Sequence, residues 1–137
     1  MVISVKTDGT KILVVDDEIG YRKVLNNVLT ERGFRVKTAA SGEEALEELK
    51  KQEFPIVIVD MKLPGGIDGL ELLQRVKGMQ NSSVLIMTAY GGIETAVEAM
   101  RRGAFNYITK PFNLEEILLN IDRMLVQQRI IEENKYL

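Results

Sequence analysis

Five short apolar runs recur at regular intervals along the chain and alternate with segments of helical periodicity. The runs are KILVV from residue 11, FRVKTA from 34, PIVIV from 55, SVLIM from 83 and FNYIT from 105. Three of them are continuous, as in strands that are buried on both faces of a parallel sheet. The alternation predicts an α/β fold, a doubly wound five-stranded parallel sheet with right-handed crossovers and helices on both faces.

The segments between the runs carry apolar residues at helical spacing. The stripes are Val24, Leu25, Val28 and Leu29; Ala45, Leu46 and Leu49; Leu70, Leu73 and Val76; Ile93, Ala96, Val97 and Met100; and Leu114, Ile117, Leu118, Ile121 and Leu125. Ser41 followed by Glu44 is a capping-box pattern, and Asn113 is an N-cap candidate. Gly33 and Gly103 mark the expected ends of the first and fourth helices.

The length of 137 residues predicts one domain, which we place at residues 11–126, after a leader at 1–10. Residues 127–137 are either an exposed frayed end or an extension of the fifth helix into a linker that pairs in a dimer. The net charge of −2 does not favour nucleic-acid binding. The sequence has neither the roughly 18-residue apolar run of a membrane span nor the apolar core of a signal peptide. We therefore expect a cytoplasmic protein.

The chain contains no cysteine and no histidine. Thiol chemistry, disulfides, imidazole catalysis and metal sites built from these residues are therefore excluded. A metal ion bound by this chain would be a hard ion with oxygen ligands, such as magnesium or calcium.

Polar side chains follow four of the five predicted strands at the point where each strand ends. Asp16 and Asp17 follow the first strand and Asp60 the third. Thr88 follows the fourth strand and Lys110 the fifth. Open α/β sheets build their sites at the carboxyl ends of strands, and in the common order 2-1-3-4-5 the crevice opens between strands one and three. The three acids are therefore expected to converge.

Each of these residues also has a simpler structural explanation. Acids after a strand often favour the dipole of the following helix, as the pair Asp17 and Glu18 would. An aspartate before a glycine-rich turn, such as Asp60, often stabilises the turn by hydrogen bonds to its backbone. A single threonine is usually structural, and a single lysine is usually a solvated surface charge. Their coincidence at successive strand ends favours one shared site.

Clustered carboxylates repel one another unless a cation lies among them, and magnesium prefers carboxylates, water and phosphate oxygens. An aspartate can attack phosphorus to form an acyl phosphate, and a metal, an ammonium group and a hydroxyl stabilise that transition state. The pattern therefore predicts Asp60 as the nucleophile. Asp16 and Asp17 would hold Mg²⁺. Lys110 and Thr88 would contact the phosphoryl oxygens.

The motifs LVVDDE, IVIVDMKLPGGIDGLELL, LIMTAY and NYITKPF, in this order, resemble the receiver domain of bacterial two-component response regulators. The likeness covers residues 11–126. It implies a flavodoxin-like fold and signal transduction in which a sensor histidine kinase transfers a phosphoryl group to Asp60 in the presence of Mg²⁺. It also implies a regulatory phosphoacceptor that assists its own phosphorylation and dephosphorylation, rather than an enzyme.

The resemblance also implies roles around the metal. Asp17 would bind Mg²⁺ directly, Asp16 mainly through water, and the backbone carbonyl of Lys62 would supply a further ligand. The Lys110–Pro111 bond is expected to be cis. The segment PGGIDG carries one glycine more than is usual in the family. The ligands stay in place, but the path of this loop is left open.

By the same resemblance, Thr88 and Tyr107 are the switch residues, although an aromatic residue in a half-buried strand usually serves packing. Phosphorylation would change the surface formed by the fourth helix, the fifth strand and the fifth helix. Lys62 and Tyr90 occupy the two positions that tune the loss of the phosphate. Because both are large and neither is a water-activating acid, we expect a long-lived acyl phosphate.

The segment TAYGGIETAVEAMRRGAFNYITKPFNLEEI is similar to receivers fused to ATPases that activate transcription with the nitrogen-regulation sigma factor. This implies an output domain outside the present sequence and a homodimer through the fourth helix, fifth strand and fifth helix. The alternatives are a stand-alone response regulator and a magnesium-dependent phosphatase of the haloacid dehalogenase type. That phosphatase class has a second acid two places after the nucleophile, where this chain has Lys62. A dinucleotide binder would need a glycine-rich turn after the first strand, and VVDDEIGY has one glycine.

Overall fold

In the computed structural model, residues 9–89 and 93–135 are described, and in them strands and helices alternate strictly. The strands are β1 (Lys11–Val15), β2 (Arg35–Ala39), β3 (Ile56–Asp60), β4 (Ser83–Thr88) and β5 (Asn106–Thr109). The helices are α1 (Ile19–Glu31), α2 (Gly42–Lys51), α3 (Gly69–Met79), α4 (Ile93–Arg101) and α5 (Leu114–Asn134). The order and type of the elements agree with the sequence prediction.

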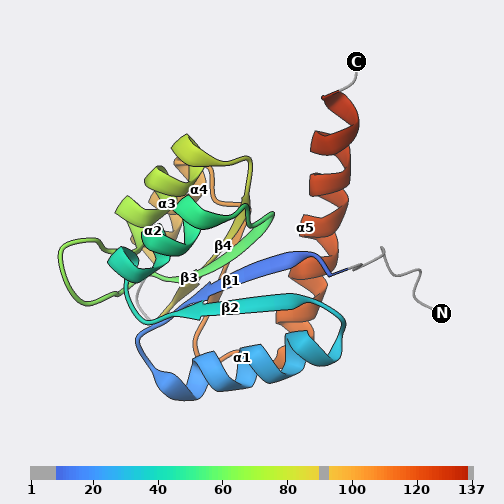
Figure 1. Ribbon diagram of the computed structural model, residues 1–137. Coiled ribbons are helices and arrows are strands. Elements are labelled where there is room, and N and C mark those ends of the chain that lie inside the picture. Colours follow the sequence, from blue (N-terminus) through green and yellow to red (C-terminus); the bar gives the residue numbers. More distant parts are fainter. Residues whose placement is uncertain (1–8, 90–92, 136–137) are drawn as a thin grey trace.

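The strands form one parallel sheet in the order β2-β1-β3-β4-β5. Helices α1 and α5 cover one face of this sheet, and α2, α3 and α4 cover the other (Figure 1). The predicted doubly wound, flavodoxin-like fold is therefore confirmed. The observed order is the 2-1-3-4-5 order that the sequence analysis used, with β2 at one edge.

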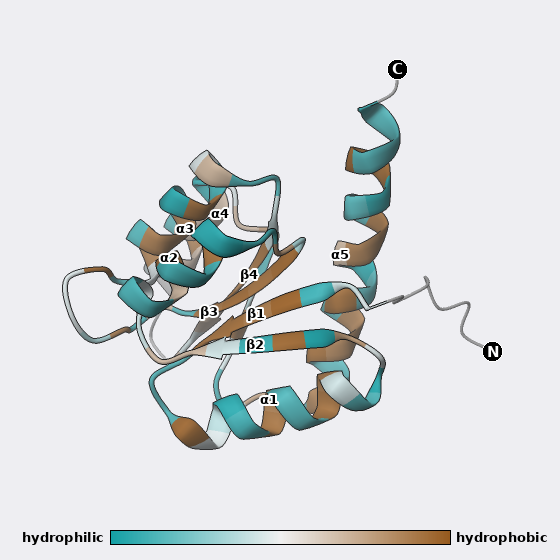
Figure 2. Ribbon diagram, in the orientation of Figure 1, coloured by the Kyte–Doolittle hydropathy of each residue, from teal (hydrophilic) through white to brown (hydrophobic). Residues whose placement is uncertain are grey.

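Each central strand contributes to two hydrophobic clusters, because successive side chains of a strand point to opposite faces of the sheet. Leu13 and Val57 belong to the cluster beneath α2, α3 and α4. Ile12 and Ile56, one residue earlier in each strand, belong to the cluster beneath α1 and α5. Figure 2 shows the central strands as predominantly hydrophobic, while the helices carry both hydrophilic and hydrophobic residues. Continuous apolar runs are the sequence signature of this two-sided burial.

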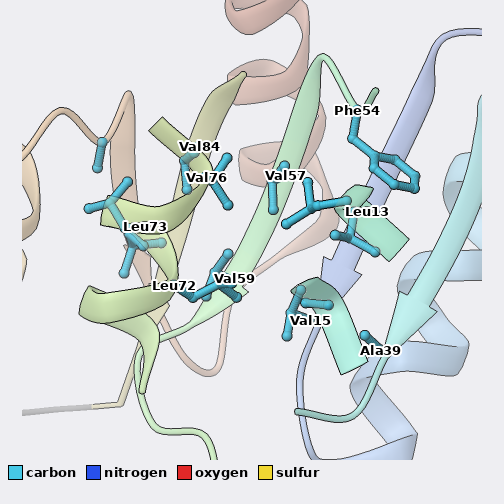
Figure 3. Packing of buried hydrophobic residues seen from close by; sticks show 14 of the residues in the cluster. Leu13, Val15, Ala39, Phe54, Val57, Val59, Leu72, Leu73, Val76 and Val84 are labelled. Carbon is cyan, nitrogen blue, oxygen red and sulfur yellow. The ribbon is translucent and has the colours of Figure 1, made fainter. Parts of the chain in front are cut away.

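Helix α3 shows how one face of the sheet is covered. Its residues Leu72, Leu73 and Val76 are fully buried. They belong to the same hydrophobic cluster as Val57 and Val59 of β3, and Figure 3 shows Leu72 beside Val59. Burial of side chains of this size contributes about 1.5–3 kcal/mol each. This packing fixes β3, and with it the carboxyl end of the strand at Asp60.

The predicted helix boundaries are confirmed by side-chain caps and by glycine conformations. The Ser41 hydroxyl accepts a hydrogen bond from the backbone N–H of Glu44 at 3.1 Å. The Asn113 side chain begins α5 by accepting from the backbone N–H of residue 116 at 2.8 Å. Gly33 and Gly103 follow α1 and α4 with φ values of 94° and 104°, a region that glycine adopts without a steric penalty.

The prediction that the apolar stripes of the helices are buried is partly wrong. Four of their members are exposed: Val24, Val97, Met100 and Leu114. In α4 the predicted Ala96 is fully buried, and so is Ala99, which the predicted stripe did not include. Two alanines three residues apart form a narrow helix face, and Val97 and Met100 lie outside that face. The side chain of Ile93 lies outside the described part of the structure.

Helix α5 is continuous from Leu114 to Asn134, and Figure 1 shows it projecting beyond the sheet. Two consecutive glutamines attach its second half to the start of β4. The amide of Gln128 donates hydrogen bonds to the Asn81 carbonyl at 2.8 Å and to the Ser83 hydroxyl at 2.9 Å. The Ser83 hydroxyl in turn donates to the side-chain oxygen of Gln127. The helix direction past the apolar core is thus fixed by polar contacts to the sheet.

None of the helices in the described residues combines the length with the apolar character that a membrane crossing demands.

Candidate functional site

Asp16, Asp60 and Lys110 meet at the carboxyl edge of the sheet. The ammonium nitrogen of Lys110 lies 2.6 Å from Oδ2 of Asp16 and 2.9 Å from Oδ2 of Asp60. Asp16 is fully buried, Asp60 is 6% exposed, and the Lys110 side chain is 9% exposed. Three residues from the ends of three different strands therefore share one enclosed ionic contact, as the sequence predicted.

The parallel register explains why these residues meet. Val15 of β1 pairs with Val59 of β3, so the next residue of each strand is an aspartate at the same edge. The backbone hydrogen bonds between neighbouring strands also continue past the ends of the strands. The Asp16 N–H donates to the Ala39 carbonyl at 3.1 Å, and the Lys110 N–H donates to the carbonyl of residue 88 at 2.8 Å. The functional side chains thus project from backbone that the sheet itself holds in place.

The charged states of Asp16 and Lys110 depend on each other, because the two groups are in direct contact. Burial raises the pKa of Asp16 above its usual value, and the nearby charge of Asp60 adds to this, while the hydrogen bond from Lys110 acts in the opposite direction. Burial alone would lower the pKa of Lys110. Its hydrogen bonds to the two carboxylates, together with their charges, outweigh burial and raise that pKa. The contacts with the two acids therefore favour the charged form of Lys110.

Asp17 and Glu18 extend the acidic group toward solvent. Carboxylate oxygens of Asp16, Asp17 and Glu18 all lie within 4.8 Å of one another. Glu18 also approaches the Lys110 ammonium nitrogen at 4.0 Å. Although Glu18 stands at the N-cap of α1, its side chain makes no capping hydrogen bond. From the sequence, Glu18 is explained by the helix dipole alone, and its place in the run of three acids is the signal that it belongs to this group.

This donor set consists of oxygens, which hard divalent cations prefer. Two acids of the group are exposed and one is buried, so a cation could be bound from solvent against a fixed inner carboxylate. Mutual repulsion among the acids would fall on binding. The residues present therefore fit a magnesium ion.

The chain turns sharply behind Asp60. The Lys62 N–H donates to Oδ1 of Asp60 at 3.2 Å, and the Gly69 N–H donates to the Met61 carbonyl at 3.0 Å. A Cβ atom at Gly69 would lie only 2.6 Å from the Asp60 carbonyl oxygen and 2.6 Å from the Met61 Cα. Glycine is needed there because the returning chain passes directly against the backbone of the functional aspartate.

The loop with the additional glycine runs over the first turn of α2. Gly65 has a φ of 88°, and the Gly66 N–H donates to Oε2 of Glu43 at 3.0 Å. Ile67 packs so tightly against Gly42 that a Cβ there would lie 2.7 Å from its Cγ2 atom. These contacts with the first residues of α2 settle the loop path that the sequence left open.

Thr88 and Tyr107 lie near this group but do not join it. Thr88 is buried, and its hydroxyl donates to the carbonyl of the next residue, Ala89, at 3.0 Å. Tyr107 is half-buried against the cluster beneath α2, α3 and α4. It pairs in register with Ile86, two residues before Thr88 on the neighbouring strand. Tyr90, the second residue expected to tune phosphate loss, lies outside the described residues.

An aromatic residue completes the surroundings of Lys110. The ring centroid of Tyr21, in the first turn of α1, lies 4.1 Å from the Lys110 ammonium nitrogen. The Tyr21 ring also contacts the Phe112 ring, with a centroid separation of 5.4 Å. Sequence reasoning missed both aromatics, because no spacing pattern links the first helix to the end of the fifth strand. The Lys110–Pro111 bond is cis, as expected.

Comparison with known proteins identifies relatives over most of the chain. Residues 12–122 match the response regulator receiver domain family. Sporulation initiation phosphotransferase F of Bacillus subtilis is 43% identical over 108 residues, which cover 78% of this chain and 86% of that protein. The transcriptional regulatory protein ZraR of Escherichia coli K12 is 36% identical over 126 residues, which cover 91% of this chain and 28% of ZraR.

Solved structures agree with these relatives. NtrX from Brucella abortus, in a complex with ATP, superposes with a TM-score of 0.87 at 34% identity, covering 93% of this chain and 29% of NtrX. A receiver domain from Clostridium thermocellum superposes with a TM-score of 0.84 at 30% identity, covering 89% of this chain and 98% of that one. The chain thus spans most of the short relatives and under a third of the longer regulators.

The presence of ZraR and NtrX among the relatives confirms the expected likeness to regulators of the nitrogen-regulation class. The family match covers most of the chain, and the strand order is the predicted one. This chain therefore belongs to the response regulator receiver domain family, the phosphoacceptor modules of two-component signal transduction.

Proposed function

We propose that this chain receives a phosphoryl group from a sensor histidine kinase on the carboxylate of Asp60. The supporting observation is the contact of Lys110 with both Asp60 and Asp16 at the end of the sheet. A carboxylate oxygen of Asp60 forms a bond to phosphorus, and the bond from phosphorus to the donor breaks. The donor group, a kinase histidine nitrogen or the acetate of acetyl phosphate, leaves with the bonding electron pair.

Lys110 has the position and the charge to assist this step. The phosphoryl group spreads negative charge over its equatorial oxygens in the transition state, and a fixed ammonium group offsets that charge. The Lys110 ammonium already lies 2.9 Å from one carboxylate oxygen of Asp60, beside the position of the transferred group. Because its pKa is raised by its two carboxylate partners, Lys110 stays charged throughout the neutral pH range.

Magnesium would be held by Asp16, Asp17 and Asp60 together with the backbone carbonyl of Lys62. The proximity of Asp17 to the buried Asp16 supports this assignment, and Glu18 places a further carboxylate beside them. A bound magnesium ion neutralises charge on the transferred phosphoryl group and its donor. Asp16 and Asp17 hold the cation in this proposal, and Asp60 shares it while acting as the nucleophile.

Thr88 and Tyr107 would convert phosphorylation into a change of surface. The Thr88 hydroxyl now donates to the carbonyl of its own neighbour, a local bond that a phosphoryl oxygen can replace with a stronger, charge-assisted one. Movement of Thr88 would free space along β4, and the half-buried Tyr107 ring would occupy it. The equilibrium between the two arrangements is biased by the new charge at Asp60.

The surface of α4, β5 and α5 is the proposed output. Its helices expose Val97 and Met100 from α4 and Leu119 from α5, apolar groups suited to a protein contact. We propose that this surface, together with the extended α5, supports a homodimer and controls an output domain that acts in transcription. The match to this chain covers only 28% of ZraR, which supports an output domain in a longer protein. The match covers 86% of phosphotransferase F, which supports the alternative of a stand-alone regulator.

The acyl phosphate is proposed to persist for minutes or longer. Lys62 is exposed beside Asp60 and carries an ammonium group, which cannot activate water as a base. Tyr90 is the second residue on which this lifetime depends.

One experiment separates a phosphoacceptor from a phosphatase. The protein is incubated with Mg²⁺ and acetyl phosphate, and its intact mass and the released phosphate are measured together. A phosphoacceptor gains one phosphoryl group, and Asp60→Asn abolishes the gain. Asp122→Asn, which removes an exposed carboxylate in α5, is the matched control and keeps it. Many turnovers of donor without a mass gain would instead identify a phosphatase.

A further inference from the structure

The ammonium group of Lys110 is enclosed by more than its two carboxylate partners. An ammonium group has three N–H donors. Oxygens of Asp16 and Asp60 accept from two directions, at 2.6 and 2.9 Å. The face of the Tyr21 ring lies on another side, with its centroid 4.1 Å from the nitrogen. The ring therefore takes a place around the cation that water would otherwise occupy.

Tyr21 is itself held in this position from two sides. It belongs to the first turn of α1, and its ring contacts the Phe112 ring at 5.4 Å with an interplanar angle of 41°. Phe112 is half-buried against the cluster beneath α1 and α5. The Tyr21 ring is thus fixed between Lys110 and Phe112, which lie two residues apart in the chain.

Electrostatics favour this arrangement for the ammonium group. The face of an aromatic ring carries partial negative charge and attracts a cation within about 6 Å of its centroid, more strongly where water is excluded. The Lys110 side chain is only 9% exposed, so the attraction acts in a poorly hydrated place. This interaction depends on the ring and not on the hydroxyl of Tyr21.

We propose that Tyr21 is a positioning residue for phosphoryl transfer to Asp60. Its ring holds the Lys110 ammonium at the Asp60 carboxylate and limits the directions in which that flexible side chain can turn. The contact becomes more important when Asp16 engages a cation, because the ammonium then loses part of the carboxylate partnership that also fixes it. The inference rests on the proposed role of Asp60 as phosphoacceptor.

The test compares Tyr21→Phe, which keeps the ring, with Tyr21→Leu, which removes it but keeps an apolar side chain. The initial rate of Asp60 phosphorylation is measured by intact mass at several concentrations of acetyl phosphate in saturating Mg²⁺. We expect Tyr21→Leu to lower the maximal rate about threefold to tenfold, and Tyr21→Phe to restore most of that loss. Equal maximal rates for Tyr21→Leu and Tyr21→Phe would mean that Tyr21 only packs α1, and would contradict the proposal.

A double-mutant comparison identifies Lys110 as the residue through which Tyr21 acts. In a Lys110→Met background, Tyr21→Leu should change the remaining rate by less than about twofold, because the cation that the ring positions is gone. Equal effects of Tyr21→Leu in both backgrounds would overturn the proposal.

An NMR readout is independent of phosphorylation. Protons above the face of a ring are shifted upfield, so the ε-methylene resonances of Lys110 should be upfield of those of exposed lysines in the wild type and in Tyr21→Phe. They should return to ordinary positions in Tyr21→Leu. Ordinary positions in the wild type would overturn the inference even if Tyr21→Leu failed to fold. A wild type that accepts no phosphoryl group, but shows the upfield shift, would refute the proposed function and not the contact.

Discussion

The shortest contact in the functional group joins Lys110 to Asp16 and not to the proposed phosphoacceptor. The ammonium nitrogen lies 2.6 Å from Asp16 Oδ2 and 2.9 Å from Asp60 Oδ2. Asp16 is therefore both a neutralising partner of Lys110 and a proposed holder of magnesium. The Lys110 ammonium and the magnesium ion would share the buried carboxylate of Asp16. The balance of charges in the site should therefore affect the stability of the folded protein.

Asp16→Asn should stabilise the folded protein at neutral pH in magnesium-free buffer. Burial and the charge of Asp60 raise the pKa of Asp16 in the folded state. A carboxyl group with a raised folded pKa contributes its full stability below its unfolded pKa, and that stability is lost as pH rises through the folded pKa. At pH 7 the free energy of unfolding in urea should therefore be larger for the variant than for the wild type. This difference should shrink as the pH is lowered toward 3.8, the pKa of the carboxyl group in the unfolded chain. A variant that is less stable than the wild type at pH 7 would show that the charge of Asp16 is net favourable.

Magnesium should raise the melting temperature, because an ion that binds only the folded state stabilises it by mass action. The gain is about 2.7 kcal/mol when the free ion is at 100 times its Kd. Asp17→Asn should weaken this gain, since Asp17 is the exposed carboxylate closest in sequence to the buried Asp16. Glu44→Gln removes an exposed acid of α2 that is not among the grouped carboxylates, and it is the control. Equal magnesium effects in both variants would exclude Asp17 from the metal site.

Gly69→Ala should destabilise the protein by about 1–3 kcal/mol, the usual range for overpacking. Its Cβ would lie 2.6 Å from the Asp60 carbonyl oxygen, and backbone atoms cannot move aside as a flexible side chain can. Gly78→Ala is the matched control in the same helix, because a Cβ there meets nothing within 4 Å. That control should be neutral or stabilising by up to about 1 kcal/mol. Denaturant unfolding measures both, and similar effects would mean that the turn behind Asp60 can relax.

Thr88→Ala should still accept the phosphoryl group but should lose most of the change at the α4–β5–α5 surface. The alanine keeps the strand and removes the hydroxyl that would bind a phosphoryl oxygen. Backbone amide shifts of residues 94–109, measured by NMR before and after phosphorylation, report the change. Full shifts in a normally phosphorylated Thr88→Ala would contradict the switch role.

The strands and the central acids were predictable because their signals are local. Continuous apolar runs mark strands buried on both faces, and the residue after each run must lie at the carboxyl edge of a parallel sheet. Asp16, Asp60 and Lys110 could therefore be placed together before the structure was known.

Other features depend on contacts between elements, which no local pattern encodes. Tyr21 reaches Lys110 only because α1 lies beside the end of β5. The path of the β3–α3 loop depends on the Glu43 carboxylate of α2. Val97 was wrongly assigned to the buried face and Ala99 was missed, because helical periodicity cannot distinguish a face of large side chains from a neighbouring face of alanines.

The most direct test of the account is to locate the phosphoryl group. The protein is phosphorylated with acetyl phosphate and Mg²⁺, the acyl phosphate is reduced with borohydride, and the modified residue is found by peptide mass spectrometry. We expect that Asp60 alone is converted to homoserine and that Lys110→Met lowers the yield sharply at a fixed short time. Modification at another carboxylate, or an unchanged yield in Lys110→Met, would contradict it.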